Sequence, residues 1–278
     1  MSVPFKPDLT NKTAVITGGG GVLCTVFARA LAECGANIAV LDLSASAAES
    51  TAAQIRESGG NAVSYACNVL KKDELVSVRE QILAEFGGID ILINGAGGNS
   101  PKATTENEYH DAESAKSFFD LTPEGFEFVF DLNILGTLLP TQVFAEHMAA
   151  NGGGCVINIS SMNAYRPLTK IPAYSAAKAG VSNLTMWLAT YFARSGVRVN
   201  AIAPGFFVTK QNKDLLFDKD GKPTARTGKI LAATPMGRFG KPEELVGALL
   251  FLCDGSASSF VNGIIIPVDG GFSAYSGV

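Results

Sequence analysis

The amino-acid sequence predicts an α/β protein that folds as a single doubly wound domain. Two observations carry this prediction: short, continuous apolar runs recur along the chain, and segments with helical spacing follow them. Continuous apolar strands of this kind are buried on both faces, which is typical of a parallel sheet covered by helices on both sides. Because no repeat, low-complexity tract or linker interrupts the alternation, we expect one domain over residues 1–278.

Each expected strand is a run of mainly apolar residues, and these runs occupy 13–17, 37–41, 62–66, 89–94, 155–160, 197–203 and 263–269. The first expected helix, 22–34, has apolar residues at helical spacing. Further helices are expected to run to about residue 58, to about 86, over 122–150, over 173–195 and onward from 242. Thr122-Pro123 and Pro242-Glu243 supply helix start signals.

The composition is that of an ordinary globular protein. Of 278 residues, 47% are hydrophobic and 17% are charged, and the formal net charge is −4. The sequence has no Lys/Arg-dense run, which argues against a nucleic-acid partner. No apolar run reaches the ~18 residues of a membrane span. The first residues, MSVPFKPDLTNK, lack the apolar core of a signal peptide, so we expect a cytoplasmic protein without a membrane partner.

The cysteines and histidines do not predict a redox or metal site. The five cysteines form no Cys-x-x-Cys pair, and most lie among apolar residues, as reduced core side chains do. His110 and His147 are not spaced as metal ligands, so we expect no metal.

Two long polar excursions, 95–121 and 205–235, interrupt the alternation. Both follow the carboxyl end of an expected strand, which is the edge where ligands bind in open α/β sheets. We therefore expect both excursions to wall a binding site. The length and charge of the second excursion suit a lid.

A glycine-rich turn, TGGGGVLC at 17–24, joins the first strand to the first helix. Such a turn aims free backbone N–H groups at one point, and the helix dipole adds positive potential that suits a pyrophosphate. Gly18 to Gly21 allow the backbone to approach a ligand closely. Because Val22 cannot easily adopt positive φ, we expect it in the first helical turn. A purely structural glycine turn is the alternative.

Asp42 ends the second strand, 21 residues beyond Gly21. A carboxylate at this place accepts hydrogen bonds from ribose hydroxyls and repels a 2′-phosphate. Neither Leu43 nor Ser44 offers a cation for such a phosphate, so the sequence favours NAD(H) over NADP(H). The alternative for Asp42 is a turn residue or a helix N-cap.

Tyr174 and Lys178 are four residues apart at the start of an expected helix, and Ser161 ends the fifth strand. A phenol with a pKa of ~10 exchanges protons poorly near neutrality, and a nearby ammonium lowers that pKa. A serine hydroxyl can steady a carbonyl oxygen. The three groups therefore suit proton transfer at oxygen while a hydride moves at carbon. An isolated Tyr-x-x-x-Lys pattern is usually without function. Here the glycine turn and Asp42 also indicate a nucleotide site, which favours a catalytic role for Tyr174 and Lys178.

In ordered combination, these residues resemble the short-chain dehydrogenase/reductase family over about residues 10–272. The landmarks are TGGGGVLC at 17–24, Asp42, NGAG at 94–97, Asn133 in DLNILG, Ser161, Tyr174, Lys178, PGFFVT at 204–209 and DGG at 269–271. The resemblance implies a Rossmann-like fold whose sheet is parallel and seven-stranded, with helices on both faces.

The resemblance also implies roles for the catalytic residues. Tyr174 is the expected general acid/base, and Ser161 orients the substrate carbonyl. Lys178 contacts the nicotinamide ribose and lowers the pKa of Tyr174, while Asn133 holds a water in a proton relay. The implied cofactor residues are Gly18, Gly20, Gly21, Val22, Leu23, Asp42, Asn68, Val69, Asn94, Ala96, Gly97, Tyr174, Lys178, Pro204, Gly205, Phe207 and Thr209.

Three departures from the family pattern bear on the cofactor site. Val22 and Cys24 stand where glycines are usual, and Asn68 stands where an aspartate often meets the adenine. Asn68 can still donate and accept hydrogen bonds there. Gly95 replaces the second Asn of the usual NNAG, which leaves one supporting hydrogen bond open.

The excursions carry cations and amides, which suit a hydroxylated carboxylate better than a steroid or an acyl chain. The pattern resembles a sugar-acid branch of the family, which interconverts D-mannonate and D-fructuronate. Alternatives are a gluconate 5-dehydrogenase or other polyol dehydrogenase, then a 3-oxoacyl-[acyl-carrier-protein] reductase, and last a nucleotide-binding sensor without turnover. The expected substrate residues are Asn99, Lys102, Ser161, Asn163, Arg166, Phe206 and Lys210.

The resemblance implies a homotetramer in which helices 123–150 and 173–195 pair across a two-fold axis. Small residues at 176–180 permit close contact between helices, although packing on the sheet explains them equally well.

Overall fold

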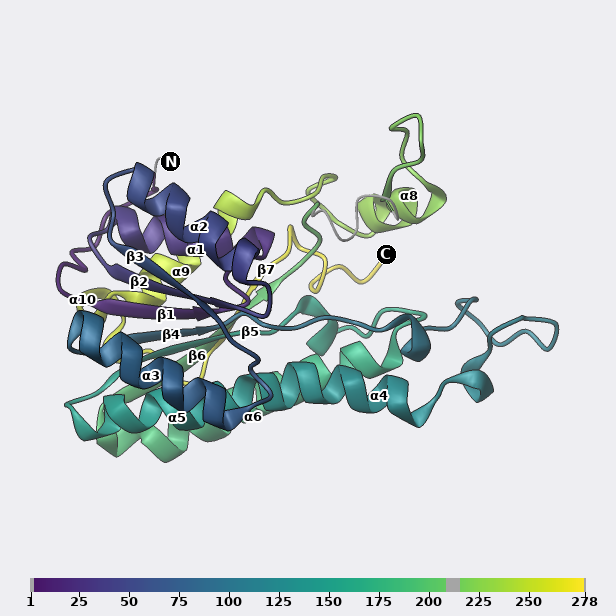
Figure 1. Cartoon of the computed structure of the whole chain (residues 1–278). Coiled ribbons are helices and arrows are strands. Elements are labelled where there is room, and N and C mark those ends of the chain that lie inside the picture. The colour runs from purple at the N-terminus through teal and green to yellow at the C-terminus, as the bar shows by residue number, and fades with distance from the viewer. Residues whose placement is uncertain (1–2, 209–215, 278) are drawn as a thin grey trace.

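The computed structural model of the protein describes residues 3–208 and 216–277. Its centre is a seven-stranded sheet in the order β3-β2-β1-β4-β5-β6-β7 (Figure 1), and every neighbouring pair is parallel. This confirms the predicted doubly wound architecture. Chain order reverses between β1 and β4, which is where such sheets bind ligands. The strands are β1 (Thr13–Thr17), β2 (Asn37–Asp42), β3 (Ala62–Ala66), β4 (Ile91–Asn94), β5 (Gly154–Ile159), β6 (Val197–Pro204) and β7 (Ile265–Val268).

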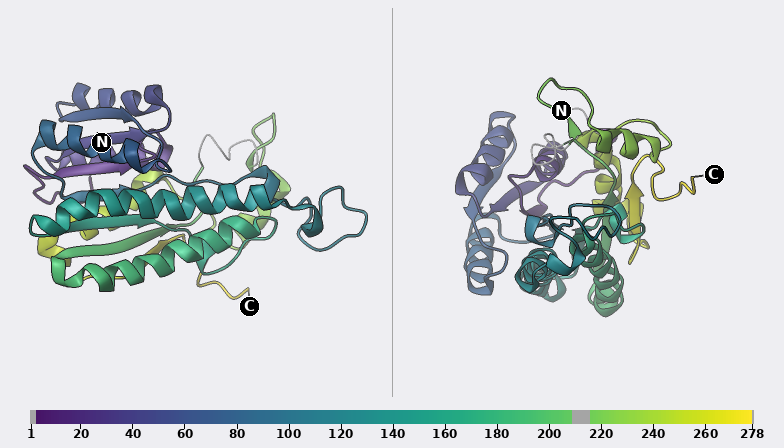
Figure 2. Two further views of the ribbon diagram at one scale, coloured as in Figure 1. Left: turned by 60° about the horizontal axis from the view of Figure 1, so that its bottom comes forward. Right: turned by 90° about the vertical axis from the view of Figure 1, so that its right-hand side faces the viewer.

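Helices cover both faces of the sheet (Figures 1 and 2). One face carries α1 (Val22–Glu33), α2 (Ala45–Glu57) and α9 (Val246–Cys253). The other face carries α3 (Lys72–Phe86), α5 (Gly136–Ala150) and α6 (Pro172–Phe192). The remaining described helices are α4 (Pro123–Phe130), α8 (Ala225–Ala232), α10 (Gly255–Ser258), and the short η1 (Pro101–Ala103), η2 (Phe118–Asp120), η3 (Asp131–Leu135), η4 (Met162–Ala164), η5 (Ala193–Ser195) and η6 (Pro242–Leu245).

A separate hydrophobic core fills each face of the sheet, because alternate strand residues point to opposite sides. Phe27 and Leu31 of α1 are fully buried in the first core, and Phe144 and Met148 of α5 are fully buried in the second. Each such side chain contributes ~1.5–3 kcal/mol relative to exposure. The five cysteines are free and buried, which confirms their predicted place as small core side chains.

The helix expected over 122–150 has a π turn in its middle. Thr122 caps α4 by accepting from the N–H of Gly125, and the π turn η3 separates α4 from α5. The whole segment 123–150 is long and apolar enough to cross a membrane, by length and composition alone. Half of its most apolar stretch is buried inside the domain, however, as expected of a helix that covers a sheet.

The two excursions extend from the carboxyl edge of the sheet (Figures 1 and 2). The first forms an arm beyond the start of α4, and the described part of the second contains α8. An ion pair joins them, with Lys229 Nζ 2.7 Å from Glu108 Oε1. The burial of Leu216, Thr227 and Ile230 shows that the described part of the second excursion has a small packed interior.

Candidate active site

The turn after β1 has the shape that the sequence predicts. α1 begins at Val22, and its N-cap Gly21 has a φ of −75°. The left-handed conformation falls on Gly18 instead, at φ +61°. No side chain in the described part of the chain caps α1, so the N–H groups of its first turn are available to an anion.

The glycine turn packs directly against the backbone that follows β4. A Cβ added to Gly18 would lie 2.9 Å from Ala96 Cα, so the two backbones have no room for a side chain between them. Thr17 Oγ1 accepts hydrogen bonds from the N–H groups of Gly95 at 3.1 Å and Ala96 at 3.3 Å. The sequence pattern did not predict this role of Thr17, which is fully buried. A threonine between an apolar run and a glycine run was the available signal.

Asp42 lies at the carboxyl end of β2, beside the glycine turn. Its carboxylate accepts from the Gly20 N–H at 3.0 Å and from the Ser44 N–H at 2.9 Å. The residue therefore has the turn-stabilising role considered as the alternative. A carboxylate offers about four acceptor positions, so further hydrogen bonds to a ligand remain available.

Several other predicted cofactor residues use their side chains for contacts within the protein. Asn94 Nδ2 donates to Thr141 and Asn158 inside the core, while its Oδ1 is buried without a partner among the described residues. Asn68 Oδ1 accepts from the Leu70 N–H. The ring of Phe207 packs against Gly240 and is buried. Thr209 and Lys210 lie outside the described residues.

The predicted catalytic residues Ser161, Tyr174 and Lys178 come together between the carboxyl end of β5 and the start of α6. Ser161 follows β5, and Tyr174 and Lys178 lie on the first two turns of α6. Lys178 is 5% exposed, and its Nζ donates to the Ile159 carbonyl at 2.7 Å. The same Nζ lies 5.7 Å from the centre of the Tyr174 ring.

Burial shifts the pKa values of both Lys178 and Tyr174. Burial lowers the pKa of Lys178 to about 8. It raises the pKa of Tyr174, and a hydrogen bond with the Ser161 hydroxyl opposes that rise. The structure thus differs from the expectation that Lys178 lowers the pKa of Tyr174. The physical reason is that the ammonium is directed to the Ile159 carbonyl and not to the phenol oxygen.

Asn133 sits in the π turn η3 and is fully buried. Its Nδ2 donates to the carbonyls of Gly98 at 2.8 Å and Val129 at 2.7 Å, while its Oδ1 has no partner among the described residues. A Cβ added to Gly97 would lie 2.8 Å from that Oδ1 and 3.2 Å from Lys178 Nζ. The unpaired oxygen, the ammonium and the bare backbone of Gly97 therefore line one small space.

The predicted substrate residues do not all remain free for a ligand. Arg166 donates to the carbonyl of Tyr275, so it holds the C-terminal tail, contrary to its expected place on substrate. Asn99 Nδ2 donates to Thr104 Oγ1 and shapes its own loop. Lys102 is exposed. Asn163 is buried two residues beyond Ser161, and its Oδ1 is unpaired within the described chain.

Three cations surround Glu108 where the arm meets α8, a contact that the sequence pattern did not predict because it joins distant segments. The pKa of Glu108 is lowered, first by the hydrogen bond from Lys229 and further by the charges of Lys170 and Arg226. One carboxylate thus faces three cations from two segments, because Arg226 and Lys229 both lie on α8.

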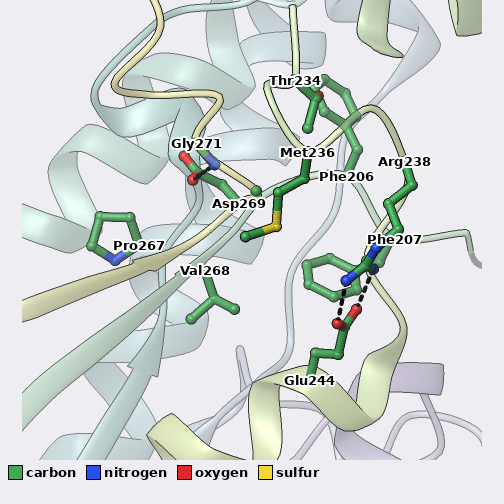
Figure 3. A pocket seen from close by; sticks show the side chains of 12 residues that line it. Phe206, Phe207, Thr234, Met236, Arg238, Glu244, Pro267, Val268, Asp269 and Gly271 are labelled. Carbon is green, nitrogen blue, oxygen red and sulfur yellow. Dashed lines mark hydrogen bonds and ion pairs between the residues drawn. The ribbon is translucent and has the colours of Figure 1, made fainter.

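A pocket lies beside the loop that follows β6 (Figure 3). Phe206 and Phe207 line one side, Thr234 and Met236 another, and the end of β7 a third. Arg238 and Glu244 form a two-pronged ion pair on its wall, with N–O distances of 2.8 and 2.7 Å. The catalytic residues described above do not line this pocket, although Phe206 is one of the expected substrate residues and Phe207 one of the implied cofactor residues.

The fold and the site together define an oxidoreductase of the nicotinamide-dependent kind. Residues 23–273 match the family model described as enoyl-(acyl carrier protein) reductase. The chain belongs to the short-chain dehydrogenase/reductase family, which confirms the resemblance seen in the sequence.

Three similar proteins illustrate the range of relatives. An uncharacterized oxidoreductase of Haemophilus influenzae is 60% identical, covering 100% of this chain and 99% of its own. A crystal structure with bound NAD of a Haemophilus influenza protein, provisionally named a D-mannonate oxidoreductase, is also 60% identical, with a TM-score of 0.95 and 98% of each chain covered. A gluconate 5-dehydrogenase from Burkholderia cenocepacia, in complex with NADP and tartrate, is 32% identical, with a TM-score of 0.82 and 96% of each chain covered.

The buried charge of Lys178 leads to a prediction about stability. Its pKa falls from 10.5 to about 8 on folding, which corresponds to a cost of about 3 kcal/mol. Because the folded-state pKa is depressed, the cost is complete below pH 8 and disappears as the pH rises toward 10.5. We expect Lys178→Met to raise the Tm of the ligand-free protein at pH 7 and to have a smaller effect at pH 10. Lys219→Met, at an exposed site, is the control. A Tm gain that is independent of pH would contradict the argument.

Proposed function

We propose that the protein uses NAD(H) to interconvert a secondary alcohol and a ketone on a sugar acid, with D-mannonate and D-fructuronate as the pair. The observation that carries the proposal is the convergence of Ser161, Tyr174 and Lys178 at the sheet edge that also holds the glycine turn. An intact acid/base set argues for turnover and against a nucleotide sensor.

A nicotinamide dinucleotide fits the residues present. The first turn of α1 offers free N–H groups to a pyrophosphate, and Asp42 keeps acceptor capacity for a ribose. Gly97 keeps the space beside Asn133 and Lys178 open, where Lys178 would hold the nicotinamide ribose. When bound, the cofactor supplies the hydride acceptor or donor.

Side chains of the protein carry out the proton transfer to and from the substrate oxygen. Ser161 Oγ donates to the substrate oxygen and fixes its position. Tyr174 Oη takes the hydroxyl proton during oxidation and returns it during reduction. The neighbouring ammonium of Lys178 stabilises the phenolate once its Nζ turns from the Ile159 carbonyl. A water on the unpaired Asn133 Oδ1 would pass the proton toward solvent.

The substrate class rests on relatives and on charge. The Haemophilus influenza structure carries the provisional name of a D-mannonate oxidoreductase, and the gluconate 5-dehydrogenase structure is a complex with tartrate, a hydroxylated carboxylate. Lys170, Arg226 and Lys229 place three cations around Glu108 at the junction of arm and α8. Long-range attraction of an acidic substrate is the expected effect of such charge.

We also propose a cytoplasmic homotetramer. Large apolar side chains stay exposed on the helices expected to pair, including Phe128 on α4 and Met186, Trp187 and Tyr191 on α6. The rings of Trp187 and Tyr191 stack with centroids 5.0 Å apart, which gives that face a flat aromatic surface. Exposed apolar patches of this kind mark protein contacts.

Activity tests the central proposal. NADH oxidation should be fastest with D-fructuronate in a panel that includes 5-keto-gluconate and a medium-chain 3-oxoacyl thioester. Tyr174→Phe should lower kcat/KM by about a thousandfold, because the proton carrier is lost. Tyr65→Phe, on the far strand β3, serves as the control. Preference for 5-keto-gluconate would support the gluconate alternative, and equal inertness of wild type and Tyr174→Phe would remove the enzyme proposal.

Cofactor choice tests the role of Asp42. Asp42→Arg should raise KM for NADH by about tenfold or more and lower KM for NADPH, because a charged hydrogen-bonding group is reversed in sign. Asp42→Asn keeps one acceptor for the turn and should mainly relax the preference. Asp73→Arg, on the exposed start of α3, controls for net charge. Unchanged KM values for both cofactors in Asp42→Arg would refute this assignment.

Light scattering tests the assembly. The wild-type protein should have the mass of four chains at micromolar concentration. Trp187→Glu should give a smaller species, because a charge would be buried in the helix seam. Phe119→Glu, on the exposed arm, should keep the wild-type mass. A monomeric wild type would contradict the proposal.

A further inference from the structure

Two unusual residues of the cofactor site, Cys24 and Gly95, compete for one space. A Cβ added to Gly95 would lie 2.2 Å from Cys24 Sγ and 2.8 Å from the Thr17 carbonyl oxygen. Non-bonded heavy atoms prefer separations of about 3.5–4.0 Å. No side chain therefore fits at position 95 while Cys24 keeps its thiol in place.

Cys24 is held firmly in that position. It lies in the first turn of α1, is 5% exposed, and belongs to the core under this helix. The backbone next to it is equally fixed, because Thr17 Oγ1 accepts from the N–H groups of both Gly95 and Ala96. Neither partner can move aside without disturbing the glycine turn.

We infer that Cys24 and Gly95 are a matched pair of positioning residues, in which the sulfur of one fills the volume left by the other and so sets the height of the glycine turn over the end of β4. This inference rests on the proposed binding of NAD(H). It explains two departures from the family pattern together. The family usually has a side chain at position 95 and a glycine at position 24, whereas this chain has Gly95 and Cys24.

The pair acts on the cofactor because it lies between the two backbones that would contact it. The start of α1 offers its free N–H groups on one side of the pair. Gly97 borders the space shared with Asn133 and Lys178 on the other side. Extra volume at position 95 would push these two walls apart, and an empty position 24 would let them close or leave a void.

The thiol suits this place electrostatically as well. Burial raises the pKa of Cys24 to about 12, and the nearby charge of Asp42 adds to that rise while Lys178 opposes it. The sulfur is therefore neutral at physiological pH. It fills volume without placing a negative charge next to the site expected to hold phosphates.

A double-mutant cycle tests the pair with the full-length protein. Kd for NAD is measured by calorimetry for wild type, Gly95→Asn, Cys24→Gly and the double variant, together with kcat at saturating NAD and Tm without cofactor. Gly95→Asn should weaken NAD binding by about tenfold or more. The double variant should recover part of that loss, because Cys24→Gly removes the contact with the sulfur and leaves the 2.8 Å contact with the Thr17 carbonyl oxygen. The kcat values should change less than Kd, because the catalytic residues are untouched.

Matched controls separate this effect from general destabilisation. Gly88→Asn adds the same side chain where nothing lies within 4 Å, and Cys34→Gly removes a buried thiol elsewhere. If Gly95→Asn does not fold, Gly95→Ala adds only the Cβ and enters the same cycle with Cys24→Gly. Loss of Tm with unchanged Kd would show that the pair is structural only, and would overturn its positioning role.

Two further outcomes would also overturn the inference. Wild-type affinity in a folded Gly95→Asn would show that position 95 tolerates a side chain. A double variant as weak as Gly95→Asn would show that the two positions do not share their space. A wild-type protein that binds no NAD would remove the proposed function and the positioning role with it, whereas the Tm cycle would still report whether the residues are matched.

Discussion

The close packing of two bare backbone segments is the constraint on which the rest of the site depends. Thr17 and Gly18, at the end of β1, lie against Gly95 and Ala96 after β4, at the point where the order of the sheet reverses. The contact exists because Gly18 has no Cβ, Thr17 binds two opposing N–H groups, and Val22 already belongs to the helix. α1 can then present its first turn to a ligand at the sheet edge.

A second constraint is the burial of groups that would be more stable in water. Lys178 lies in the interior with a single backbone acceptor, and the phenol of Tyr174 has its pKa raised. The Nζ of Lys178 donates to the Ile159 carbonyl at the end of β5 and not to the phenol. A bound substrate and cofactor would change the balance of charge in this space, so the proton chemistry depends on what is bound as well as on the protein.

Local pattern was sufficient to predict much of this molecule. The strands were found from continuous apolar runs, and the start of α1 was placed correctly because a β-branched residue disfavours positive φ. The five cysteines were recognised as core residues because of their apolar neighbours. These features depend on residues close together in the sequence, so pattern and backbone sterics are enough to reveal them.

Features that depend on tertiary contacts were not predictable in the same way. The hold of Arg166 on the C-terminal tail joins residues 109 positions apart, and Lys229 meets Glu108 across 121 positions. The π turn at Asn133 has no sequence signature of its own. Cys24 and Gly95 were both noticed as unusual, but only the three-dimensional packing shows that one explains the other.

The distribution of unsatisfied polar atoms ties these points to function. In the described chain, the buried side-chain atoms without a partner are the Oδ1 atoms of Asn94, Asn133 and Asn163 and the Oγ of Ser175. Each would cost ~1–3 kcal/mol if left without any partner. The Oδ1 of Asn94 lies in the core, whereas the other three atoms lie near the acid/base set in the chain or in space. Asn163 is two residues from Ser161, Ser175 is next to Tyr174 in the sequence, and the Oδ1 of Asn133 shares a space with Lys178. A fold selected for stability alone would fill these places with apolar groups. Their concentration around the acid/base set indicates a surface built to be completed by water, cofactor and a hydroxyl-bearing substrate.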